Sequence, residues 1–150
     1  MDADSSKINA QYQTLLVVWF ALLVSQFLFV LIIYFVRPAL FHFDPAAPLL
    51  GSNFLIVISL AVVSLSNLVM SFTWEKKYLN QSVTEQNVFL VQTALITSCA
   101  LCEAISLCGL LLAFVANYQY FFLFFGLGIL GTILHMPSRK NLLTASYKRL

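Results

Sequence analysis

The sequence predicts an all-α integral membrane protein with four transmembrane helices in an antiparallel up-down bundle. Of its 150 residues, 61% are hydrophobic and only 9% are charged, whereas soluble domains carry about 25% charged residues. The chain contains four apolar runs close to the length of about 20 residues that a helix needs to cross the hydrocarbon of a bilayer. These runs are apolar on all sides, which favours helices over the alternating strands of a membrane barrel. We therefore expect residues 1–150 to form a single transmembrane domain.

The four helices are expected at about residues 14–36, 49–72, 88–115 and 120–136. The first run is too long for the core of a signal peptide and lacks a positive segment before it, so we expect it to be retained. Segment 37–48 contains three prolines and is expected to be a loop. Residues 73–87 are expected to form a second loop, in which Ser82 and Glu85 match a capping box that would start the third helix near Val83.

The basic residues indicate an orientation. If all four runs cross the membrane, seven of the eight Lys and Arg residues fall on one side. The positive-inside rule then places both termini, the 73–87 loop and the short basic tail 137–150 in the cytoplasm. We expect a multi-pass protein of the cell inner membrane whose environment is the lipid bilayer, and nothing in the sequence indicates nucleic-acid binding.

Glu103 is the most informative polar residue, because it interrupts the apolar run CALCEAISLCGLLLAF. It is predicted to lie near the middle of the membrane, where a charged side chain costs about 2.5–3.5 kcal/mol or more. No Lys, Arg or His lies at the same predicted depth. Glu103 is therefore either a reversible carrier of a proton or another cation that faces a partner or the boundary between lipid and protein, or a neutral acid hydrogen-bonded to Ser59, Ser66 or Asn67 of the helix at 49–72.

Polar and small residues accompany Glu103 along the predicted third helix. Gln92, Cys99, Glu103 and Ser106 share one polar stripe at helical spacing. A neighbouring stripe consists of the small residues Ala94, Ser98, Cys102, Ser106, Gly109 and Ala113, and small residues let helices approach closely in lipid. In the second run, Ser52, Ser59 and Ser66 recur every seven residues. We expect the second and third helices to pack along these faces, with Glu103 at or beside the contact.

Three other motifs are better explained by packing than by chemistry. Cys99 and Cys102 have CxxC spacing, but in a lipid-embedded helix they are expected to be buried thiols rather than a redox or metal site. GLGILG, residues 126–131, lacks the strand and exposed turn of a dinucleotide site, so we expect close helix packing there. His135, which lies before Pro137, is expected to be interfacial, with a proton relay as the alternative.

Enzymatic activity, a metal and a cofactor are not expected. The sequence contains no nucleophile–base pair, no HExxH motif and no second carboxylate predicted to lie inside the membrane.

Residues 91–114, VQTALITSCALCEAISLCGLLLAF, resemble the carboxylate-bearing helix of the c subunit, the rotor-ring proteolipid of ATP synthases. The matching elements are Gln92-Thr93-Ala94, Ala100-Leu101, Glu103-Ala104 and the run from Gly109 to Phe114. The resemblance implies that Glu103 carries an ion. It also implies protons, because Ala104 stands where sodium-binding members tend to carry a hydroxyl residue. The chain departs from the family in its loop, which lacks the Arg-Gln/Asn-Pro signature, in its glycine-poor second run and in its two additional helices.

The sequence therefore predicts an integral membrane subunit resembling a c-type proteolipid, in which Glu103 carries a proton. The candidate supporting residues are Ser59, Ser66, Asn67, Gln92, Cys99 and Ser106. Such a subunit is expected to form a homo-oligomer or to join a membrane complex, with a basic residue supplied by a partner. The alternative is a non-transporting structural or accessory membrane protein, in which Glu103 is a neutral interhelical hydrogen-bond group.

Overall fold

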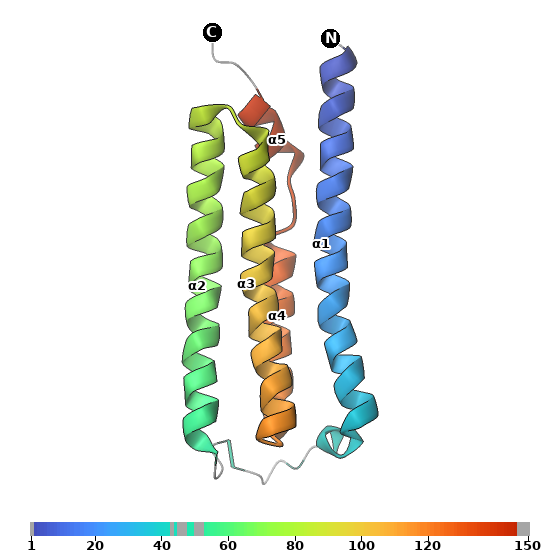
Figure 1. The fold of residues 1–150 in the computed structure, drawn as a ribbon, viewed down its shortest axis with the longest axis vertical. Coiled ribbons are helices and arrows are strands. Elements are labelled where there is room, and N and C mark those ends of the chain that lie inside the picture. Colours follow the sequence, from blue (N-terminus) through green and yellow to red (C-terminus); the bar gives the residue numbers. More distant parts are fainter. Residues whose placement is uncertain (1, 43, 45–47, 50–52, 147–150) are drawn as a thin grey trace.

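The computed structural model describes residues 2–42, 44, 48–49 and 53–146, which form an elongated bundle of helices (Figure 1). The elements are α1 (Asp2–Val36), the 3-10 turn η1 (Pro38–Phe41), α2 (Phe54–Glu85), α3 (Val88–Val115), the 3-10 turn η2 (Gln119–Phe121), α4 (Phe122–Leu134) and α5 (Arg139–Ser146). The described residues contain no strand, so the all-α prediction is confirmed.

Three helices are long and apolar enough to cross a membrane, namely α1 over Lys7–Val36, α2 and α3. A fourth crossing is present if Gln119–Leu134 and α5, which meet at a bend of 46°, form one broken span. α4 alone has 13 residues, or about 20 Å at 1.5 Å per residue, which is less than the hydrocarbon thickness. The helix expected at 120–136 is therefore present as η2 and α4 but ends at Leu134, and Pro137, which has no N–H to donate, lies in the break before α5.

The predicted boundaries of the third helix agree with α3, but those of the second helix do not agree with α2. α2 begins at Phe54 rather than at residue 49, and it continues to Glu85 rather than ending at residue 72. Most of the segment expected to be the 73–87 loop is therefore helical. The apolar run ends at residue 72 because polar residues follow it, but in the structure these polar residues extend α2 to Glu85.

The turn between α2 and α3 corrects the predicted capping box. The Ser82 hydroxyl donates to a carbonyl of its own helix at 2.7 Å, so Ser82 does not start α3 near Val83. α2 ends where Gln86 adopts a left-handed backbone with a φ of 50°. The N-cap of α3 is Asn87, whose Oδ1 accepts a hydrogen bond of 3.0 Å from the N–H two residues later, as Asn commonly does at this position.

α3 is the central helix, because it packs against α1, α2 and α4. Figure 1 shows it between α1 and α2, with α4 beside it. The six small residues predicted to allow close approach are all buried: Ala94, Ser98, Cys102, Ser106, Gly109 and Ala113. The stripe is thus a packing face, as expected, but much of it contacts α4 rather than α2.

Two glycines of α4 determine how closely it approaches α3. A Cβ atom added at Gly128 would lie 2.7 Å from the carbonyl oxygen of Cys102 and would also collide with the Ser106 hydroxyl. A Cβ added at Gly131 would lie 2.6 Å from the Cys102 sulfur. The GLGILG motif therefore serves helix packing, as predicted, whereas its first glycine, Gly126, has no such atom within 4 Å.

α2 packs against α3 through a different face from the one predicted. Along its apolar part the buried residues are Val57, Ser64 and Ser71, which also recur every seven residues. Ser59 and Ser66 are exposed, and Ser52 lies outside the described residues. The predicted spacing of seven residues was therefore correct, but the predicted serines lie on the wrong face of α2. Serine is small enough for either face of the helix, so its spacing alone does not identify the buried one.

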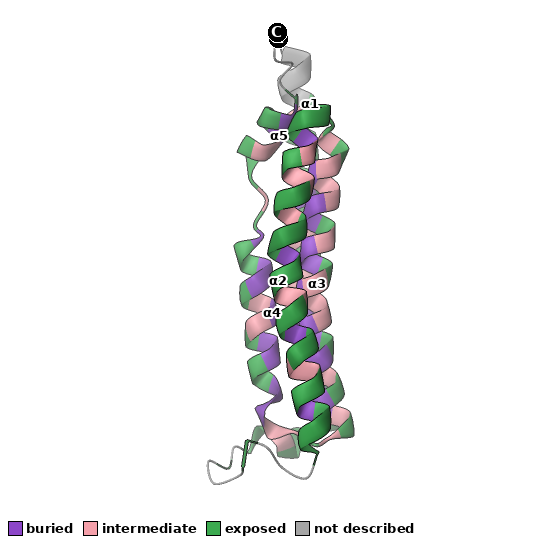
Figure 2. Cartoon of the chain, turned by 90° about the vertical axis from the view of Figure 1, so that its left-hand side faces the viewer, coloured by how far each residue is buried: buried purple, intermediate pink, exposed green. Residues whose placement is uncertain are grey.

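The outer faces of α1 and α2 are apolar. Large side chains such as Val17, Phe35 and Leu55 are 68%, 73% and 67% exposed, and Figure 2 shows exposed residues along the visible face of α2. Apolar surface on this scale is unfavourable in water but favourable against lipid chains. The fold and this surface together indicate a membrane protein.

Replacing Gly128 with alanine is expected to destabilise the contact between α3 and α4, because the added Cβ would meet the Ser106 hydroxyl and, at 2.7 Å, the backbone carbonyl of Cys102, which cannot rotate away. Overpacking of this kind costs about 1–3 kcal/mol, which should lower the midpoint of thermal unfolding in detergent micelles by several degrees. Gly126→Ala, on the same helix but with open space beside it, is the matched control and should leave the midpoint unchanged. Equal losses in the two variants would contradict the packing role of Gly128.

Candidate functional site

Glu103 is partly buried on α3, and its carboxylate faces α1. Its Oε1 accepts a hydrogen bond of 2.5 Å from the Ser25 hydroxyl, which also lies 2.8 Å from the carbonyl oxygen of Leu22. A serine hydroxyl has one hydrogen to donate. Ser25 can donate to an ionised Glu103, or it can donate to Leu22 while a protonated Glu103 donates to Ser25. The contact therefore suits both protonation states of the acid.

The partners expected for Glu103 on α2 do not occupy this position. The hydroxyl of the exposed Ser66 donates to the carbonyl oxygen of Val62 in its own helix at 2.8 Å. Ser59 is also exposed, and Asn67 is partly buried. The hydroxyl that contacts the carboxylate comes instead from α1.

A polar network, buried at Gln26, Ser106 and Thr132 and partly buried at Trp19, lies beside the contact between Glu103 and Ser25. The Ser106 hydroxyl donates to Gln26 Oε1 at 2.8 Å, and Gln26 Nε2 donates to the Thr132 hydroxyl at 2.7 Å. The Thr132 hydroxyl donates to the carbonyl oxygen of Gly128 at 3.0 Å, and the indole N–H of Trp19 donates to the Thr132 carbonyl at 2.8 Å. This network joins α1, α3 and α4 through side chains that lipid could not satisfy.

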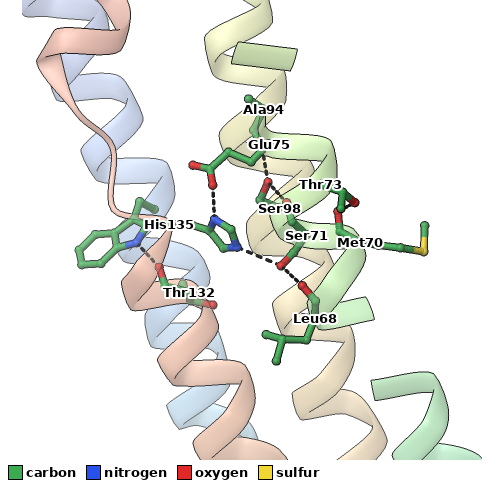
Figure 3. Close-up of polar contacts among 10 residues, drawn as sticks. Leu68, Met70, Ser71, Thr73, Glu75, Ala94, Ser98, Thr132 and His135 are labelled. Atoms are coloured by element: carbon green, nitrogen blue, oxygen red, sulfur yellow. Dashed lines mark hydrogen bonds and ion pairs between the residues drawn. The ribbon is translucent and has the colours of Figure 1, made fainter. Parts of the chain in front are cut away.

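A second cluster forms around the buried imidazole of His135, just after α4 (Figure 3). Nδ1 of His135 lies 2.7 Å from Glu75 Oε2, and Nε2 lies 3.0 Å from the Ser71 hydroxyl. The Ser98 hydroxyl of α3 lies 3.0 Å from the Ser71 carbonyl oxygen. The cluster therefore links α2, α3 and the segment that follows α4.

The contacts of the Ser71 hydroxyl determine which nitrogens of His135 carry a hydrogen. The Ser71 hydroxyl lies 2.7 Å from the carbonyl oxygen of Leu68 as well as 3.0 Å from His135 Nε2. If Ser71 donates to Leu68, then Nε2 must carry a hydrogen, and His135 is an imidazolium because Nδ1 donates to Glu75. If His135 is neutral, Ser71 turns to donate to Nε2. A change of protonation at His135 thus requires only the rotation of one hydroxyl group.

Cys102 lies between the two clusters on α3. It directly precedes Glu103 in the sequence, and its sulfur packs against Gly131 of α4, where an added Cβ would lie 2.6 Å from it. The three cysteines are free and buried, in agreement with their predicted role as packing thiols. Among the described residues, no group of three or more His, Cys, Asp or Glu side chains is arranged to hold a metal ion.

No protein-family model, curated protein or solved structure matches the chain. Its function must therefore be inferred from the chemistry of these buried polar groups.

The predicted supporting residues divide into two groups. Ser106 is one helical turn from Glu103 and joins the network that includes Gln26. Gln92 instead lines a small groove of about 150 Å³ with residues of α1, and Cys99 lies in an apolar cluster that contains Leu15. Only part of the predicted polar stripe therefore belongs to the site around Glu103.

Several site residues were not predicted from the sequence. Ser25 and Gln26 form the one consecutive polar pair inside the first apolar run, and an uninterrupted polar pair at that depth is a usable signal. Glu75 was placed in a loop because the extension of α2 was not foreseen. The sequence predicts an interfacial His135, with a proton relay as the alternative; its side chain is fully buried and contacts Glu75 and Ser71, which the sequence did not indicate.

The contact between His135 and Glu75 is expected to stabilise the fold. In a double-mutant cycle with His135→Gln and Glu75→Gln, we expect a favourable coupling free energy of about 0.5–3 kcal/mol, as is usual within one polar network. The measurement is the free energy of unfolding of each variant in mixed micelles.

A matched pair on the same helix provides the control. Gln81 Nε2 donates to Glu85 Oε1 at 2.7 Å on an exposed face, and this pair should couple by no more than about 0.5 kcal/mol. A coupling between His135 and Glu75 as small as that of the control would show that their contact is not stabilising.

Proposed function

We propose that the chain is a four-span protein of the cell inner membrane that binds and releases a proton at Glu103. In this proposal, α4 and α5 together complete the fourth crossing, and both termini lie in the cytoplasm. The start of α1, the turn between α2 and α3, and α5 lie at one end of the bundle (Figure 1). Lys76, Lys77 and Lys140 belong to that end, whereas Arg37 follows α1 at the other end, where it donates to Asn117 Oδ1 at 2.9 Å.

The position of the buried polar groups carries the proposal. The cluster around His135 lies nearer the proposed cytoplasmic end, and the cluster around Glu103 lies at the middle of α3. Beyond Glu103 the bundle is filled by apolar clusters, one built around Ile33, Ala113 and Phe121 and another around Ile105 and Leu112. Nearer the proposed cytoplasmic end, an apolar cluster that includes Leu95 and Leu142 packs beside the polar cluster of His135. Glu103 thus lies at the inner limit of a polar region that an apolar layer closes on the far side.

This arrangement supports proton exchange from the cytoplasmic side. A proton that reaches the carboxylate converts Glu103 into a neutral acid that donates to Ser25, whose own hydrogen turns to the carbonyl of Leu22. Release reverses both steps. In this proposal the proton passes between Glu103 and the cytoplasmic end by way of His135 and Glu75, two titratable groups whose side chains lie 2.7 Å apart.

A partner is part of the proposal. The resemblance of residues 91–114 to the c subunit implies exchange between Glu103 and a basic residue of another subunit. In the described structure, however, Ser25 of α1 occupies the position next to the carboxylate. We therefore propose a homo-oligomer or a subunit of a membrane complex in which a partner contacts the bundle at α1 and α3, rather than a ring in which Glu103 is already open to the stator.

A structural role is the second candidate function, and one observation favours it. The bond from Ser25 satisfies Glu103 within the chain, as a neutral interhelical hydrogen bond would require. A structural acid would keep one protonation state, whereas a carrier must exchange its proton with the medium. The two functions are therefore distinguished by whether Glu103 responds to pH.

The test is labelling with dicyclohexylcarbodiimide in native membranes, because this apolar reagent reacts with protonated carboxyl groups that it can reach from lipid. For a proton carrier, we expect labelling at Glu103 that decreases as the pH rises, since fewer carboxyl groups are protonated at higher pH. Glu103→Gln should abolish the label, and Glu103→Asp should retain it. The labelled residue is identified by peptide mass spectrometry.

Glu85→Gln is the matched control, since Glu85 is exposed at the end of α2, and it should leave the labelling of Glu103 unchanged. Labelling that is the same at every pH would favour the structural role. The absence of any label at Glu103, combined with full function of Glu103→Gln in cells, would exclude the carrier.

A further inference from the structure

A groove of about 520 Å³ lies between α2 and α5, at the end of the bundle that carries most basic residues. Its walls combine two kinds of side chain. The apolar ones include Phe72, Leu79 and Val83, and the polar ones include Lys76, Lys140 and Asn141. A site of this composition suits a ligand that is apolar at one end and anionic at the other.

The charges of the groove favour an anion. Neither Lys76 nor Lys140 forms an ion pair with another described residue, so both ammonium groups are available. Glu75 also lines the groove, but its Oε2 is engaged by the buried His135 at 2.7 Å. The amide of Asn141 adds a neutral donor beside the two lysines, and ammonium and amide donors together are well suited to a phosphate group.

The groove continues into the apolar surface of α2. Leu65, Val69, Phe72 and Lys76 follow one another on one face at helical spacing. Leu65 and Val69 are 57% and 63% exposed, and Phe72 is 40% exposed. This strip leads from the lysines toward the middle of the bundle, along the direction that an acyl chain takes from its headgroup. A soluble phosphate would leave this strip unused.

We propose that the groove between α2 and α5 binds an anionic phospholipid, with its phosphate at Lys76 and Lys140 and one acyl chain along Phe72 and Val69. Basic pockets at the cytoplasmic ends of membrane helices are suited to such headgroups. The proposal does not depend on proton binding at Glu103, because none of the groove residues contacts that carboxylate.

The experiment is native mass spectrometry of the full chain in detergent, with phosphatidylglycerol or phosphatidylcholine added at equal concentration. We expect phosphatidylglycerol to be retained preferentially. The double variant Lys76→Gln/Lys140→Gln should bind it roughly 25-fold more weakly, or about fivefold for each lysine near a membrane surface. Lys76→Arg/Lys140→Arg keeps both charges and should retain most of the binding, which guards against loss of binding through misfolding.

The matched control is Lys7→Gln/Lys77→Gln, which removes the same total charge from two exposed lysines that do not line the groove. It should leave the preference for phosphatidylglycerol intact. An equal loss in this control, or equal binding of the two lipids by the unaltered chain, would overturn the proposal. Displacement of the lipid by inorganic phosphate at the same concentration would also overturn it, because the site would then recognise a soluble anion.

Discussion

The close approach of α4 to α3 at Gly128 and Gly131 is the contact on which the other interactions depend. Lipid gives helices no hydrophobic reason to associate, so packing and interhelical hydrogen bonds must hold them together. Without side chains at these glycines, the backbone of α4 reaches Cys102 and Ser106. The same approach places Thr132 within 2.7 Å of Gln26 and His135 within 3.0 Å of Ser71. The polar clusters thus form because small residues on α3 and α4 let these helices approach closely.

The apolar packing beyond Glu103 is part of the proposed function. Around Ile33, Ala113 and Phe121 the side chains are almost completely buried, and the described residues that pack in this cluster are all apolar. In the proposed function, exchange of a proton at Glu103 is therefore directed toward Glu75 and the proposed cytoplasmic end. Transfer across the whole membrane would need a partner or a rearrangement of α1, which is why the proposal includes a second subunit.

The sequence was sufficient for some elements because their signal is local. α3 coincides with its predicted range, since an apolar run with a polar residue at each end defines a membrane helix almost by itself. The partner of Glu103 was not predictable in this way. Ser25 lies 78 positions away in the sequence, and its contact depends on the rotation of α1 against α3. The buried face of α2 was not predictable for the same reason. Ser66 and Ser71 are equally acceptable in lipid, and only the way α2 packs against the other helices distinguishes them.

Ser25 and Ser71 solve the same physical problem at the two clusters. Each hydroxyl lies between a titratable group and a carbonyl oxygen of its own helix, at Leu22 and Leu68. When Glu103 or His135 gains or loses a proton, the serine rotates its single hydrogen from one acceptor to the other. The helix backbones stay in place, so the tightly packed glycine contact is not disturbed. The proposed proton exchange is in this way compatible with close packing, because it moves one hydroxyl hydrogen rather than a helix.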